Sequence, residues 1–95
     1  MPIVLKPAQP KLTAIIEPSK DGYVASCPEL DLVTEGDNPD EALDDLTDMA
    51  LDYAEQYIAE LERFSQSPNR ASHAPYVRAI HANPTKAGVR ALFEA

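Results

Sequence analysis

Apolar and polar residues alternate along three short stretches in the first third of the chain, the pattern of strands that bury one face. The predicted strands are residues 11–17, 23–27 and 31–35. Pro18 and Pro28 are predicted to end the first two strands, because proline cannot donate to a strand ladder. Gly22 supplies turn chemistry between them. We therefore expect a three-stranded antiparallel sheet.

The pattern changes between residues 38 and 64 to a spacing of three or four residues, which is typical of an amphipathic helix. The apolar stripe consists of Leu43, Leu46, Ala50, Tyr53, Tyr57, Leu61 and Phe64. Asn38 is a suitable N-cap, Pro39 fits the first helical position, and Glu41 completes a capping box. The sequence thus predicts one long helix that covers the sheet and buries both tyrosines.

The last part of the chain, residues 65–95, is predicted to hold two short helices after a loop at residues 65–70. Tyr76, Val77 and Ile80 have helical spacing, and the pattern returns near Val89 after a second proline-containing cap at residues 83–84. A strand at residues 76–80 is the alternative. The fold class expected is α+β: a sheet, one long helix and two short C-terminal helices.

With 95 residues, the chain is expected to form one small domain. Three segments are predicted: an extended arm at residues 1–10, the sheet and long helix at 11–64, and a helical extension at 65–95. The arm is either a tail or, at residues 3–5, an added edge strand that pairs within or between chains. It resembles neither a signal peptide nor a membrane span. Since Cys27 is the single cysteine, we expect a reducing, cytoplasmic location.

The net charge of −8 is concentrated in the middle of the chain, where residues 35–64 sum to −10. Nucleic-acid binding depends on Lys and Arg, so this segment is not expected to contact phosphates and suits a basic protein partner. The last segment sums to +3, which leaves DNA binding through Arg78, Lys86 and Arg90 as an alternative.

Carboxylates line the predicted helix opposite its apolar stripe. They are Asp40, Glu41, Asp44, Asp45, Asp48, Asp52, Glu55 and Glu62. Like charges at i, i+4 destabilise an isolated helix by roughly 0.2–0.5 kcal/mol per pair, so packing must hold this helix. The face is either solvated or a docking surface, since one ridge does not converge its oxygens around a metal ion. The predicted partner-binding residues are Asp44, Asp48, Leu51, Asp52 and Glu55.

Candidate catalytic residues are few and scattered. His73 and His81 have no cysteine or paired carboxylate nearby in sequence, and we expect ordinary surface or helix-end histidines. Cys27 lies in a predicted strand and is expected to be a small buried hydrophobe. We expect no cofactor, no metal and no enzymatic activity.

The stretch GYVASCPELDLVTEGDNPDEAL resembles the signature of the HicB-like antitoxin family. Three elements carry the resemblance: residues 27–30 at the end of the second strand, 33–37 at the end of the third, and 41–43 at the start of the helix. The resemblance implies a partial ribonuclease-H-like fold without catalytic carboxylates. It also implies a role in silencing a HicA-like toxin, a basic mRNA-cleaving ribonuclease. Residues 65–95 match neither of the DNA-binding modules that many such proteins carry at this end.

These observations lead to one functional hypothesis and two alternatives. The chain is expected to be an antitoxin-like binding protein, a dimer or higher homo-oligomer, that blocks the RNA-binding surface of a basic ribonuclease. The first alternative is a structural or regulatory homo-oligomer without a toxin. The second is a DNA-binding transcriptional autorepressor.

Overall fold

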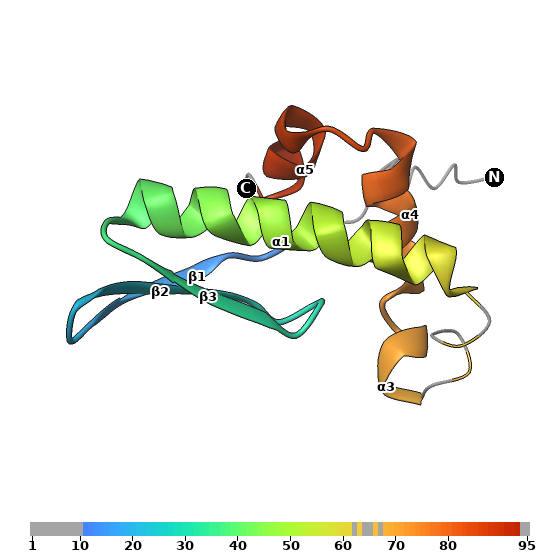
Figure 1. Cartoon of the computed structure of the whole chain (residues 1–95), viewed down its shortest axis with the longest axis horizontal. Helices are drawn as coiled ribbons and strands as arrows, with labels where there is room; N and C mark the ends of the chain where they lie inside the picture. Colours follow the sequence, from blue (N-terminus) through green and yellow to red (C-terminus); the bar gives the residue numbers. More distant parts are fainter. Residues whose placement is uncertain (1–10, 62, 64–65, 67, 94–95) are drawn as a thin grey trace, which may run out of the picture.

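The computed structural model describes residues 11–61, 63, 66 and 68–93, in which a long helix crosses one face of a small sheet (Figure 1). The sheet is antiparallel, with the order β1-β2-β3. Its strands are β1 (Ile15–Ser19), β2 (Gly22–Cys27) and β3 (Leu32–Gly36). The helices are α1 (Pro39–Ala59), α3 (Pro68–Ala71), α4 (Ala74–Ala82) and α5 (Lys86–Leu92). The predicted α+β class and its sheet-and-helix arrangement are confirmed.

Strand β1 differs most from its prediction, because it starts four residues late and contains the proline that was expected to end it. The preceding backbone bonds elsewhere: Leu12 donates to the carbonyl of Leu92 at 2.8 Å, and Thr13 donates to the Glu29 carboxylate at 2.9 Å. Pro18 is tolerated within β1 because this strand lies at the edge of the sheet.

Helix α1 begins as its sequence predicts. The Asn38 side chain accepts a hydrogen bond from the Glu41 amide at 2.9 Å, and Pro39 occupies the first turn. The helix ends earlier than expected, at Ala59. Leu61 is 51% exposed, so its assignment to the core-facing stripe was wrong. The predicted end of the stripe at Phe64 lies outside the described residues.

The core forms where α1 meets the sheet on one side and the C-terminal helices on the other. Leu46, Tyr53 and Tyr57 of α1 are buried in it, as predicted. The inner face of β2 contributes Ala25 and Cys27. Burial raises the pKa of the Cys27 thiol to about 11, so this side chain acts as the small buried hydrophobe that was expected.

The C-terminal segment packs against α1 through α4 and α5, and the strand alternative at residues 76–80 is wrong. Val77, Ile80 and Val89 enter the core. The N-cap of α5 is Thr85, which accepts from the Gly88 amide at 3.0 Å, instead of the predicted cap at residues 83–84. The short helix α3 lies within the segment expected to be a loop.

Candidate protein-binding surface

The exposed side of α1 carries a row of carboxylates, which we call the acidic ridge. Its members are Asp40, Glu41, Asp44, Asp45, Asp48, Asp52 and Glu55. The ridge faces solvent because the opposite side of the helix supplies the buried stripe. The side of the helix that carries the carboxylates was therefore predicted correctly from periodicity.

One flank of the ridge is bound by a cation from α5. The ammonium group of Lys86 lies 2.8 Å from a carboxylate oxygen of Asp44 and 3.5 Å from one of Asp48. The hydrogen bond to Asp44 raises the pKa of Lys86. All three side chains remain about half exposed, so this is a solvent-screened pairing that a competing cation can reach.

The five predicted partner-binding residues are thus divided by the fold. Asp44 and Asp48 meet at Lys86, whereas Asp52 and Glu55 are exposed farther along the ridge. Leu51 is half-buried and packs against the core, so only part of its side chain can reach a partner. Nothing in the sequence signalled the role of Lys86, which lies 42 residues from Asp44.

The other flank of the ridge adjoins the edge of the sheet. Thr34 of β3 donates a hydrogen bond from its hydroxyl to the Asp45 carboxylate. Helix α1 packs more extensively on β3 than on β1. The acidic ridge and the edge strand β3 therefore form one continuous surface.

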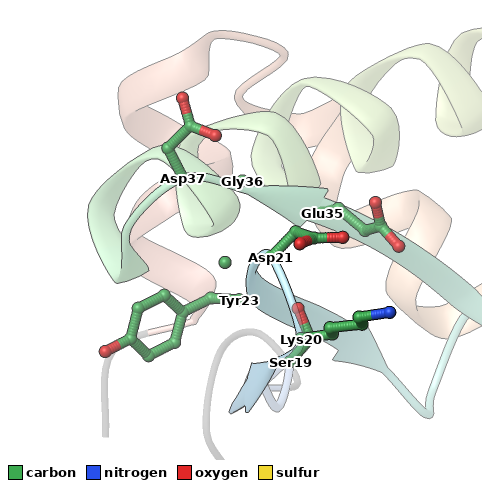
Figure 2. A pocket seen from close by; sticks show the side chains of 8 residues that line it. Ser19, Lys20, Asp21, Tyr23, Glu35, Gly36 and Asp37 are labelled. Carbon is green, nitrogen blue, oxygen red and sulfur yellow. The ribbon is translucent and has the colours of Figure 1, made fainter.

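A hollow of about 290 Å³ lies between the β1–β2 turn and the end of β3 (Figure 2). The β1–β2 turn and the end of β3 line it, contributing the carboxylates of Asp21, Glu35 and Asp37 together with Lys20. The backbones approach closely here: a Cβ on Gly22 would lie 2.5 Å from the carbonyl oxygen of Gly36. With three carboxylates and one ammonium group, the lining of the hollow has a net negative charge.

A buried histidine joins three parts of the fold away from this surface. His73 is only 4% exposed, and although it is the N-cap residue of α4, it is not the ordinary helix-end histidine that was expected. Its Nδ1 lies 2.5 Å from the Tyr53 hydroxyl and its Nε2 lies 3.2 Å from the Asp31 carboxylate. Asp31 adopts a φ of 56°, and the Arg70 guanidinium sits 5.4 Å from the centre of the Tyr53 ring. The histidine therefore ties α1, α4 and the β2–β3 turn together.

In the part of the chain that the structure describes, no three His, Cys, Asp or Glu side chains converge to hold a metal ion. Within the same ranges, no helix combines the length and apolar character needed to cross a bilayer.

The fold thus places an exposed acidic helix on a small α+β scaffold. A sequence model of the PHD-like family, described as the antitoxin of toxin-antitoxin, RelE/RelB, TA system, matches residues 3–95. The chain belongs to this antitoxin family, which points to a regulatory protein and not to an enzyme.

A solved structure agrees with this assignment. The chain is similar to a crystal structure from Syntrophomonas wolfei subsp. wolfei, described as the antitoxin part of a proposed toxin/antitoxin system. The TM-score is 0.80 at 25% identity, over 90% of this chain and 62% of that one. This chain thus spans less than two thirds of that protein's length. No curated protein matches.

Proposed function

We propose that this chain is an antitoxin that neutralises a small, basic toxin by protein–protein binding, with its acidic ridge facing the toxin. The observation that carries the proposal is the row of exposed carboxylates on α1 in a member of an antitoxin family. A protein that cleaves RNA needs a cationic surface for phosphates, and an anionic helix can occupy that surface. Occupation would exclude RNA without any chemistry by the antitoxin.

Charge and apolar contact have separate roles in this proposal. Opposite charge accelerates the encounter and selects the orientation, whereas the lifetime of a complex depends on contacts in its desolvated centre. The acidic ridge supplies the charge that accelerates the encounter. The exposed part of Leu51, which lies beside the ridge on α1, is available for the apolar contact.

Two kinds of toxin are consistent with these features. The HicB-like signature in β2, β3 and the first turn of α1 favours a HicA-like mRNA-cleaving ribonuclease. The family description instead names RelE/RelB. Both are tested by co-expressing the chain with the product of a neighbouring short, basic reading frame and identifying the protein that co-purifies.

Charge reversal on the ridge tests the binding surface. Asp52→Lys, alone and with Asp48→Lys, is expected to weaken binding of the co-purifying toxin about tenfold or more, because attraction becomes repulsion. Glu17→Lys is the matched control, since it makes the same change in net charge on β1, and it is expected to have a much smaller effect. Equal losses in all variants would contradict a role for the ridge.

A homo-oligomer without a toxin is the second candidate function. Ile15 is 41% exposed and Val33 61% exposed on the face of the sheet away from α1, where Ser26 separates them in the register. Light scattering of the purified chain would give its oligomeric state.

DNA binding has weaker support because one of its three candidate cations, Lys86, is paired with Asp44. A promoter gel shift at low salt tests it.

A further inference from the structure

We propose that the toxin adds an extended segment to the free edge of β3, directly beside the acidic ridge. This inference rests on the proposed function and specifies how the toxin binds. Strand addition uses backbone hydrogen bonds for affinity and alternate side chains for specificity.

The sheet has two outer strands, but only one presents an edge suited to pairing. Within the described residues, β1 and β3 each pair with β2 alone. Strand β1 contains Pro18, and a proline at an outer edge blocks pairing because it has no N–H. Strand β3 contains no proline, so every outward-facing residue of this strand has an N–H group.

The register identifies which amides of β3 face outward. Ser19 and Gly22 flank a two-residue hairpin turn, so they form a hydrogen-bonded pair, and bonded pairs then alternate along the ladder. Pro18 consequently faces the open edge of β1, which agrees with its missing N–H. By the same alternation, the residues of β3 opposite Tyr23 and Ala25 bond to β2, and Val33 and Glu35 direct their backbone groups outward.

The charge beside this edge selects a cationic occupant. Side chains of an added strand would alternate between the outer face, near Val33, and the inner side, where Asp45 reaches Thr34. Cations on the inner side would meet the acidic ridge. A second copy of this chain is disfavoured there, because edge-to-edge pairing would bring two acidic ridges together, each on a chain with a net charge of −8.

A proline placed in the outward position tests the proposal. Val33→Pro removes an amide that is not used within the sheet, so the fold is expected to persist, as judged by circular dichroism and thermal unfolding. Its affinity for the co-purifying toxin should fall about tenfold or more. Val33→Ala keeps the amide and shortens the side chain, and its affinity should change by less than about threefold.

Amide exchange in the native chain provides a second measurement that does not depend on the variant folding. The amides of Val33 and Glu35 should exchange rapidly in the free chain and slowly in the complex. Failure of the native chain to bind the toxin would overturn the proposed function and this inference together. A normal complex in which both amides stay unprotected, and Val33→Pro binds as tightly as the native chain, would overturn this inference alone. Protection of these amides without toxin would assign the edge to a second copy and also overturn it.

Discussion

Glu29 fixes the path of the chain into the sheet. Its carboxylate accepts hydrogen bonds from the Thr13 amide at 2.9 Å and the Thr13 hydroxyl at 2.6 Å. Burial acts to raise the pKa of Glu29, but the hydrogen bonds to its carboxylate, led by the two from Thr13, together outweigh burial and lower the pKa below its ordinary value of 4.5. The charged form is therefore the one that the fold stabilises.

Replacing this carboxylate should change stability in a pH-dependent way. A lowered pKa contributes stability that is present above pH 4.5 and is lost as the pH falls through the folded-state pKa. Glu29→Gln should lower the free energy of unfolding by about 1 kcal/mol at neutral pH, and by less in acid. Urea unfolding of both proteins at neutral pH and near pH 3 measures this. An equal difference at both values would contradict it.

The buried histidine gives a second prediction at this scale. Because a carboxylate only accepts, a neutral His73 ring donates from Nε2 to Asp31 and accepts at Nδ1 from the Tyr53 hydroxyl. Tyr53→Phe leaves Nδ1 without this donor in a buried site, which should cost about 1–3 kcal/mol in urea unfolding. Tyr76→Phe, at a half-buried position of α4, is the control and should leave the free energy of unfolding nearly unchanged. Similar losses in both variants would argue against the histidine contact.

Sequence reasoning could not find this histidine contact. Asp31, Tyr53 and His73 are 20 or more residues apart, and no periodicity or spacing links them. Tyr53 was predicted to be buried from its place in the helical stripe, which is a local signal. The partner of its hydroxyl depends on how α4 docks, which is not local.

Individual helices and strands could be predicted where the residues that determine them are close together in the sequence. The cap at Asn38 and the hairpin at Gly22 are set by residues next to one another, and both were placed correctly. The start of β1 was misplaced because Leu12 bonds to Leu92, 80 positions away. Likewise, the stripe continues to Leu61 in sequence, but the structure leaves that residue exposed.

The junction of β3 with α1 depends on one glycine. A Cβ on Gly36 would lie 2.4 Å from the Ala42 amide nitrogen and 2.7 Å from its Cα, both backbone atoms that cannot move aside. Gly36→Ala should therefore push α1 away from β3 and destabilise the fold by about 1–3 kcal/mol or more. Thermal unfolding measures the loss.

Gly88→Ala is a suitable comparison for that substitution. Its Cβ would meet the side-chain amide of Asn83, which is exposed and can partly rotate, as well as the Asn83 carbonyl. We expect a smaller loss than for Gly36→Ala. A larger loss at Gly88 would mean that the α4–α5 turn, and not the β3–α1 junction, limits stability.

Across the whole molecule, the sequence predicted where charge is concentrated along the chain, but not how the charged residues meet in space. The −10 segment and the solvent side of α1 could both be read from residue order. The pairing of Lys86 with Asp44 and Asp48, and the continuity of the ridge with β3, required the fold. Part of the +3 charge of residues 65–95 thus neutralises part of the −10 charge of residues 35–64.

Removing that internal cation should accelerate binding of a basic toxin. Lys86→Ala leaves Asp44 and Asp48 without their shared partner, so the ridge attracts cations more strongly. Stopped-flow association with the co-purifying toxin should be faster by a factor of about two to five at low ionic strength. The advantage should disappear near 1 M salt, where the screening length falls to about 3 Å. Arg78→Ala makes the same change in net charge from α4 and should accelerate binding less. Equal acceleration in both variants would mean that total charge, and not the ridge, directs the encounter.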